Sequence, residues 1–115
     1  MRVLLSLYLL VGIANAAAAG VNCEALAKEA NDNSVALRPP ETHRVQGSGR
    51  LYFFSAPNAL CKTPAVFVIP GDQLVVYSEQ GSWYQVMYLN AKTSDDFEGW
   101  VEKTRLKYVG TVGPR

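Results

Sequence analysis

The sequence has little histidine and no excess of charge of either sign. It contains a single histidine, His43, and its 11 lysine and arginine residues face 10 aspartate and glutamate residues. Nucleic acids and anionic membrane surfaces attract proteins with a clear basic excess, so this balance argues against both as partners. A lone histidine without a second ligand nearby favours no metal site. We therefore expect His43 to be a solvated loop residue and the chain to carry no cofactor.

Cysteine is almost as scarce, because the chain has only two, Cys23 and Cys61. Neither belongs to a CxxC motif or has a histidine close by, which argues against the alternative of a reactive or metal-binding thiol pair. An even pair of cysteines in an oxidising compartment usually forms a disulfide, so we predict a bond between Cys23 and Cys61. The sequence also offers no nucleophile matched with an acid or base, and we predict that the protein is not an enzyme.

Only one stretch is apolar over a long run, the N-terminal MRVLLSLYLLVGIANAAAAG. Arg2 is followed by an apolar segment at 3–13 and by small residues at 14–19, which are the three parts of a secretory signal. The run is too short for a permanent membrane span. We predict a signal peptide over 1–19, cleaved after Ala19, and a periplasmic or secreted protein without membrane insertion. A buried N-terminal helix is the alternative.

Residues 23–33, CEALAKEANDN, are predicted to form a helix. Glutamate, alanine, leucine and lysine are good helix formers, and the apolar side chains recur near helical spacing. The helix is too short to be stable alone, so we expect it to lie against the rest of the fold. Residues 35–49 contain Pro39-Pro40 and the turn-like QGSG, which predict a linker. The helix and linker together make up residues 20–49.

From Arg50 onward the apolar residues recur with a period of two, which is typical of β-strands. Short turns separate the segments, and no crossover helix is predicted between them. The predicted strands cover residues 50–56, 65–69, 73–79, 83–90, 98–102 and 105–109. The pattern favours a mainly β fold, with a small antiparallel β-barrel of five to six strands at 50–109 and a C-terminal tail at 110–115.

Four motifs in this region follow the order found in one known family: Ser55-Ala56-Pro57, Pro70-Gly71-Asp72, Gly81-x-Trp83 with Val86, and Gly99-Trp100-Val101. Together they resemble the bacterial SH3 domain, over residues 50–109. The chain departs from the family pattern at Cys61 and in the longer connection LNAKTSDDF. The resemblance implies a five-stranded SH3-like barrel in an exported, stand-alone member. The family that the chain resembles includes modules that bind cell-wall peptides, select protein partners or hold larger proteins together.

Alternation along the first predicted strand separates Tyr52 and Phe54 from Leu51 and Phe53, which take the core side. In SH3-like barrels, aromatic residues of the first loop and of strand ends line a shallow groove, so the resemblance implies the same role for both tryptophans. The predicted ligand-binding groove is lined by Tyr52, Phe54, Trp83 and Trp100. The alternative is that the two tryptophans close the ends of a small core.

The Gly99-Trp100-Val101 motif also predicts a local arrangement. Gly99 has no Cβ, which lets the backbone pass close to a neighbouring strand. Trp100 is expected to face away from the core. Val101 is expected to face the core together with three apolar residues of neighbouring strands, Leu74, Val76 and Val86.

The connection before this motif carries the acidic sequence SDDFE. A calcium site needs six or more oxygen ligands from a shaped loop, and this spacing fits no EF-hand loop, so we predict a solvated hairpin tip. Its charge suits a contact with a protein partner, where it would fix register and speed encounter. The residues of this predicted partner loop are Asp95, Asp96 and Phe97.

These observations predict a non-catalytic, exported, SH3-like binding protein that recognises a cell-wall peptide or an envelope protein. The alternative is an immunity protein or inhibitor that neutralises a toxin or peptidoglycan hydrolase acting in the periplasm. A structural accessory subunit of an envelope complex is a third reading. Homodimerisation through an edge strand is compatible with each of them.

Overall fold

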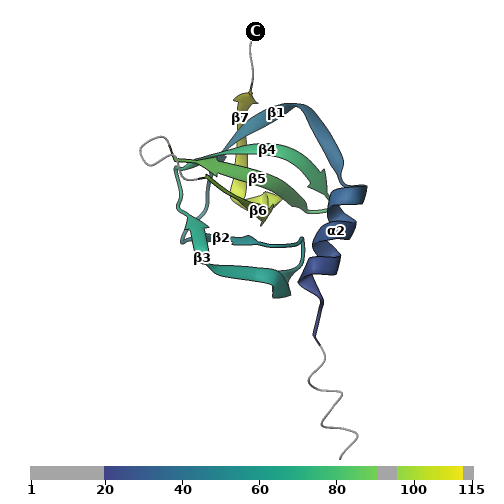
Figure 1. The fold of residues 1–115 in the computed structure, drawn as a ribbon. Helices are drawn as coiled ribbons and strands as arrows, with labels where there is room; N and C mark the ends of the chain where they lie inside the picture. The colour runs from purple at the N-terminus through teal and green to yellow at the C-terminus, as the bar shows by residue number, and fades with distance from the viewer. Residues whose placement is uncertain (1–19, 91–95, 113–115) are drawn as a thin grey trace, which may run out of the picture.

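Within residues 20–90 and 96–112, which the computed structural model describes, the chain forms one antiparallel sheet and one α-helix (Figure 1). The predicted signal peptide, Asp95 and the last three residues of the predicted tail lie outside this part. The elements in chain order are α2 (Cys23–Asn33), β1 (Val35–Val45), β2 (Leu51–Phe54), β3 (Lys62–Val68), β4 (Gln73–Gln80), β5 (Trp83–Leu89), β6 (Asp96–Glu102) and β7 (Leu106–Thr111). Short 3₁₀ turns precede β3 and β7, at Ala59–Cys61 and Lys103–Arg105.

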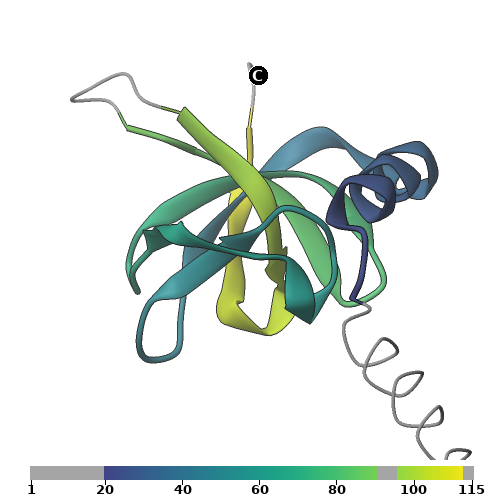
Figure 2. The same cartoon turned by 60° about the horizontal axis from the view of Figure 1, so that its bottom comes forward.

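The sheet has seven strands in the order β3-β2-β6-β5-β4-β1-β7, and every described pairing is antiparallel. Its strands curve around a common interior (Figure 2). Strands β3 and β7 are the two edges, and the described residues contain no pairing between them. The prediction of a mainly β, antiparallel fold with one short helix is confirmed. The predicted closure into a barrel of five or six strands is not confirmed, because the hydrogen-bonded sheet is open and has seven strands.

The additional strand is β1, so the prediction of a linker is wrong for Val35–Val45. This strand pairs with β4 on one side and with β7 on the other. Pro39 and Pro40 lie where the register between β1 and β4 shifts, between Ala36 and Glu41. Proline is tolerated at such an irregularity because its missing N–H interrupts no ladder hydrogen bond there. The prolines therefore bend the strand without ending it.

The prediction of a solvated His43 is also wrong, because this residue lies on β1 with only 3% of its surface exposed. Its ring meets the rings of Tyr84 and Tyr108 edge-on, at centroid distances of 4.9 and 5.7 Å. Its Nε2 lies 2.9 Å from Oε1 of Glu41. His43 shares the inward side of β1 with Val45 and is a packing residue between β1, β5 and β7.

The inward side chains of the sheet form the hydrophobic core. Alternation along β2 buries Leu51 and Phe53, as predicted, and leaves Tyr52 and Phe54 half-buried on the outer side. The core cluster consists of Val45, Leu51, Phe53, Val68, Leu74, Val76, Val86, Val101 and Leu106. The prediction for Val101 and its three core neighbours is therefore confirmed. Full burial of side chains of this kind stabilises a fold by roughly 1.5–3 kcal/mol each.

Pro70-Gly71, part of one of the four sequence motifs, forms a type II turn between β3 and β4. The N–H of Asp72 donates to the carbonyl of Ile69 at 3.0 Å, and Gly71 has a φ of 100°, a value that favours glycine. The Asp72 carboxylate in turn accepts from the N–H of Ile69 at 2.9 Å. These two hydrogen bonds fix the direction in which β4 leaves β3.

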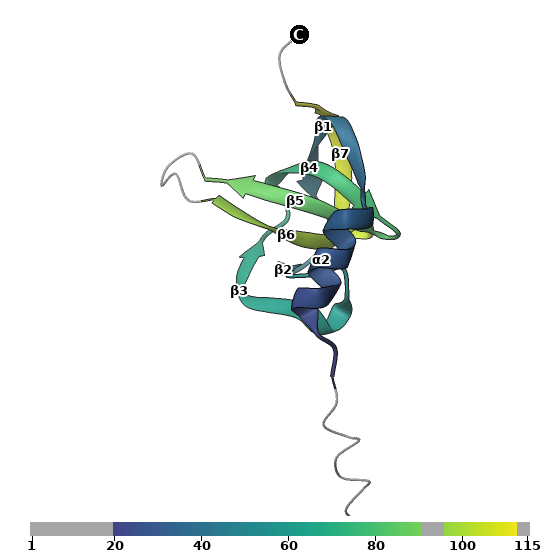
Figure 3. The same ribbon diagram turned by 45° about the vertical axis from the view of Figure 1, so that its right-hand side comes forward.

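Helix α2 forms over the predicted residues, Cys23–Asn33. The side chain of Asn22 accepts from the N–H of Ala25 and so caps the first turn. The helix lies beside β5 and β6 (Figure 3), and Ala30 is its fully buried residue. Among the described residues, no helix is long and apolar enough to cross a membrane.

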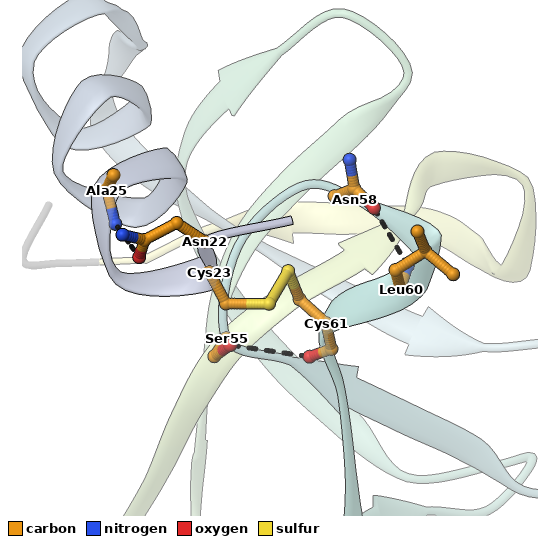
Figure 4. The surroundings of a disulfide bond; sticks show 7 residues. All are labelled: Asn22, Cys23, Ala25, Ser55, Asn58, Leu60 and Cys61. Atoms are coloured by element: carbon orange, nitrogen blue, oxygen red, sulfur yellow. Dashed lines mark hydrogen bonds between the residues drawn. A yellow bond between two sulfur atoms is a disulfide. The ribbon is translucent and has the colours of Figure 1, made fainter. Parts of the chain in front are cut away.

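The predicted disulfide between Cys23 and Cys61 is present (Figure 4). It joins the first residue of α2 to the 3₁₀ turn before β3, across a sequence separation of 38 residues. Local hydrogen bonds hold the turn: Asn58 accepts from the N–H of Leu60 at 2.8 Å, and the N–H of Ser55 donates to the Cys61 carbonyl at 2.9 Å. The disulfide therefore ties α2 to an ordered connection between β2 and β3.

Removing this bond should destabilise the fold, because closing a loop of this length restricts the unfolded chain by about 4 kcal/mol in the loop-closure model. We expect replacement of both Cys23 and Cys61 by serine to lower the free energy of unfolding by about 2–4 kcal/mol. Guanidinium denaturation of the oxidised wild type and of the double variant measures this difference. A double variant as stable as the oxidised wild type would contradict the account.

Gly99→Ala should destabilise the sheet, because a Cβ at this position would lie 2.9 Å from the Phe54 carbonyl oxygen and 3.2 Å from Cβ of Phe53. We expect a loss of about 1–3 kcal/mol in the free energy of unfolding. Gly110→Ala is the matched control, since a Cβ there would meet no atom within 4 Å. Equal stability of the two variants would show that the close approach of β6 to β2 is absent.

Candidate functional site

The outer side of β2, turned away from the core, carries two aromatic residues that contact two others. Tyr52 lies opposite Phe67 of β3, and their ring centroids are 5.5 Å apart. Phe54 meets Trp83 of β5 in a T-shaped contact with a centroid distance of 5.1 Å. We call these four residues, Tyr52, Phe54, Phe67 and Trp83, the aromatic face. The structure thus brings together three of the four residues predicted to line a groove.

The aromatic face remains partly open to solvent. Phe67 exposes 38% of its surface, and the other three residues are half-buried. Aromatic pairs in tilted or edge-to-face contact stabilise each other by about 0.5–1.5 kcal/mol beyond the area they bury. The rings therefore hold one another in place while still presenting apolar surface to solvent.

Trp100 does not belong to this face, because only 2% of its surface is exposed. It faces away from the core, as predicted, since its neighbour Val101 faces inward, but a position in an exposed groove is contradicted. Trp100 pairs with Gln85, whose side-chain amide donates to Asn31 of α2 at 3.0 Å. Helix α2 therefore lies over this part of the outer side, and its cover explains the burial of Trp100.

Two cations lie over the rings of the aromatic face. The guanidinium of Arg50 is 4.3 Å from the centroid of Phe67, and its Nη1 lies 3.4 Å from the hydroxyl of Tyr52. The ammonium of Lys62 is 4.5 Å from the centroid of the Tyr52 ring. Cation–π contacts at exposed sites are worth about 0.5–1 kcal/mol each. Both charges are therefore held close to Tyr52.

A shallow depression of about 210 Å³ lies next to these cations. It is lined by aromatic, apolar and charged residues: Arg50, Leu51, Tyr52, Phe54, Lys62, Glu102 and Arg105. Pockets that enclose a drug-sized ligand or cofactor usually have about 300–1,000 Å³. The depression therefore has room for a small group, such as one or two residues of a longer ligand.

Arg105 positions the loop that carries Arg50. Its Nε donates to the carbonyl of Gln46 and its Nη2 to the carbonyl of Gly49, both at 2.7 Å. A weaker bond of 3.4 Å joins Nη1 to the carbonyl of Arg50. The planar guanidinium thus binds three backbone carbonyls of the connection between β1 and β2, and this connection is a turn, as predicted for QGSG.

The predicted partner loop is only partly described. Asp96 and Phe97 are the first residues of β6 and are exposed, while Asp95 lies outside the described residues. They pair with Leu89 and Tyr88 of β5, respectively. Asp96 and Phe97 therefore lie, with exposed side chains, at the end of the hairpin formed by β5 and β6. They are not among the residues that line the depression.

Two tyrosines outside the aromatic face have perturbed acidity. Burial, and next the hydrogen bond in which the Tyr77 hydroxyl donates to Glu98 at 2.9 Å, raise the pKa of Tyr77. Burial also raises the pKa of Tyr84, and the nearby Lys103 partly opposes this shift. Both phenols are therefore protonated at neutral pH and act as neutral packing and hydrogen-bonding groups.

The described residues offer little for metal or redox chemistry. In residues 20–90 and 96–112, no group of three or more histidine, cysteine, aspartate or glutamate side chains is placed to hold a metal ion. Both cysteines are in the disulfide. His43 is enclosed by two tyrosine rings and Glu41. The chemical groups that the outer side of the sheet offers are aromatic rings and charged side chains.

Comparison of the chain with protein-family models, with curated proteins and with solved structures finds no match. The resemblance to the bacterial SH3 domain therefore rests on the four sequence motifs.

Sequence reasoning missed Phe67, Arg50 and Lys62 as members of the site. The register of β2 and β3 shifts between Tyr52 and Phe53, so the partner of Tyr52 does not follow from simple alternation. Lys62 belongs to a strand that begins three residues earlier than predicted. An available signal was the repeated placement of basic residues, Arg50 and Lys62, at the ends of strands that carry aromatic residues.

Acrylamide quenching should distinguish the two tryptophans of the chain. Trp100→Phe leaves half-buried Trp83 as the fluorophore, and we expect it to be quenched several-fold more efficiently than Trp100 in the Trp83→Phe variant, because burial excludes the quencher. Steady-state Stern–Volmer measurements on both oxidised variants give the comparison. Similar quenching constants, or the reverse order, would contradict the placement of Trp100 beneath α2.

Proposed function

We propose that the chain is a non-catalytic, exported binding protein that recognises a cell-wall peptide or an envelope protein through its aromatic face. The observation that carries this proposal is the group of four aromatic side chains left open to solvent, with Arg50 and Lys62 over its rings. Neighbouring exposed rings of this kind are typical of recognition surfaces. Aromatic residues and arginine also provide a large share of binding energy at protein interfaces.

An SH3-like barrel is the fold that we propose for residues 50–109. The curvature of the sheet supports it, as do the turn at Pro70-Gly71 and the close approach of Gly99 to the carbonyl of Phe54. In this reading β1 and α2 are N-terminal additions: β1 extends the sheet between β4 and β7, and α2 covers part of its outer side. The aromatic face is then the part of the groove that α2 leaves uncovered.

The disulfide supports an exported location. Such bonds form and persist in oxidising compartments and are rare in the cytosol. The apolar run at 1–19 supplies the predicted export signal. A periplasmic or secreted protein would meet cell-wall peptides and envelope proteins directly.

The proposal is tested by capture experiments with the immobilised, oxidised chain on two materials in parallel, isolated sacculi and a periplasmic extract. We expect one of the two to be retained by the wild type. Tyr52→Ala should weaken retention by roughly ten-fold or more, the size of effect seen at interface hot spots. Tyr108→Ala is the matched control, because this tyrosine is exposed on edge strand β7 and is absent from the aromatic face.

Retention that survives Tyr52→Ala and falls with Tyr108→Ala would move the binding surface to the other edge of the sheet. Failure of the wild type to retain sacculi or any stoichiometric protein would refute the proposed function itself. Circular dichroism of each variant confirms that the fold is retained.

An immunity protein or inhibitor is the second candidate, and a separate observation favours it. Leu89 and Phe97, at the end of the hairpin formed by β5 and β6, expose 53% and 41% of their surfaces beside the acidic Asp96. Apolar anchors with a charged rim are common in protein interfaces. The target would be a periplasm-acting toxin or a peptidoglycan hydrolase.

This second candidate predicts a different mutational pattern. Phe97→Ala should abolish capture of one stoichiometric protein, while Tyr52→Ala leaves that capture intact. Neither the wild type nor either variant should retain sacculi. Capture that depends on Tyr52 and tolerates Phe97→Ala would exclude it.

A further inference from the structure

The depression beside Tyr52 is more positively charged than the chain as a whole. The full sequence has 11 basic and 10 acidic residues, whereas the lining of the depression has three cations and the single carboxylate of Glu102. Among the described residues, neither Arg50 nor Lys62 has a carboxylate within ion-pair distance. Elsewhere Lys28 and Lys103 are paired with acidic partners. Arg50 and Lys62 are thus available to an anion from outside.

The two available cations converge on one ring. Lys62 lies over the face of Tyr52, and Arg50 reaches the hydroxyl of the same residue. Arg105 holds the backbone of the Arg50 loop through three carbonyls, so the fold fixes the point from which the Arg50 side chain starts. A pre-positioned guanidinium and ammonium suit a carboxylate, because arginine can bind it in a bidentate manner and lysine adds a second charge.

The remaining lining limits what accompanies that carboxylate. The ring of Phe54 provides an apolar surface, which fits a small apolar side chain next to the charged group. Glu102 disfavours a second negative charge on its side and can accept a hydrogen bond from an amide N–H. The volume of about 210 Å³ admits one or two residues.

We propose that this depression is a carboxylate-binding subsite, in which Arg50 and Lys62 hold the single carboxylate of a peptide and Phe54 contacts the apolar residue beside it. The proposal rests on the proposed function, because it names the ligand class of the same face. Arg105 is a positioning residue that orders the Arg50 loop. The shared chemistry, a carboxylate at or near the end of a peptide, occurs in cell-wall peptides and in protein chain termini.

The first test is a titration of the ¹⁵N-labelled, oxidised chain with acetyl-alanyl-alanine and with its C-terminal amide. We expect the acid to shift the amide signals of residues 50–54 and 62 and to bind about ten-fold more tightly than the amide, the effect of losing a charge-assisted contact. Glu102→Gln should strengthen binding of the acid. Equal binding of acid and amide, or shifts confined to other parts of the sheet, would overturn the proposal.

Variants separate the subsite from general electrostatic attraction. Arg50→Gln and Lys62→Gln, singly and together, should reduce binding of the acid, while Lys107→Gln, which removes an exposed charge from β7, should leave it unchanged. The same spectra report whether each variant is folded. Reduced binding in all variants alike, including Lys107→Gln, would contradict a specific subsite.

Capture experiments distinguish this inference from the proposed function and identify the source of the carboxylate. Loss of sacculus retention in the Arg50→Gln/Lys62→Gln variant assigns the subsite to cell-wall peptides, and loss of a captured protein assigns it to a protein terminus. If Tyr52→Ala abolishes capture and the double variant retains it, the carboxylate subsite is wrong and the proposed function stands. If the wild type captures nothing, the proposed function is wrong, and the peptide titration decides whether the carboxylate subsite exists.

Discussion

The bond between Cys23 and Cys61 attaches helix α2 to the connection between β2 and β3, on the outer side of the sheet. An isolated helix of this length is marginal in water, so its stability depends on this attachment and on packing. The helix in turn covers the region of Trp100, and Gln85 links its Asn31 to the sheet. The aromatic face is the part of the outer side that the helix leaves uncovered. One covalent constraint thus divides the outer side of the sheet into a second packed layer and a surface available for binding.

The available surface combines apolar rings with charge in a way that suits recognition. Arg50 and Lys62 lie over Phe67 and Tyr52, respectively, so their stems and charges cover part of the apolar surface in the absence of a ligand. A chain with almost balanced charge therefore still has a local positive region. Such a region adds selectivity for anionic groups, while the rings provide contact area.

Much of the fold could be predicted because periodicity, turn residues and helix propensity can be recognised directly in the sequence. The period of two predicted that Leu51 and Phe53 lie in the core, and the Pro70-Gly71 pair indicated the turn before β4. Helix-forming residues predicted α2, and the presence of only two cysteines predicted the disulfide. The strand β1 was missed because two prolines argue against a regular strand, and only the sheet irregularity beside them makes one possible.

The candidate site was predicted in part, and the errors have a common physical cause. Alternation correctly assigned Tyr52, Phe54 and Trp100 to the outer side of the sheet, but it gives no information on what covers that side. The cover over Trp100 comes from α2, whose position is set by tertiary contacts. The contacts of Phe67 and the two cations likewise depend on register across β2 and β3, which shifts within the pair.

The central claim is that the uncovered aromatic face is the surface through which the protein meets its ligand in the cell. Site-specific photo-crosslinking tests it most directly, with p-benzoylphenylalanine introduced in place of Tyr52 or, as a control on the opposite edge, in place of Lys107. The account predicts a defined crosslinked product in living cells from position 52 and none from position 107. A product from position 107 alone would contradict it and place the binding surface on β7.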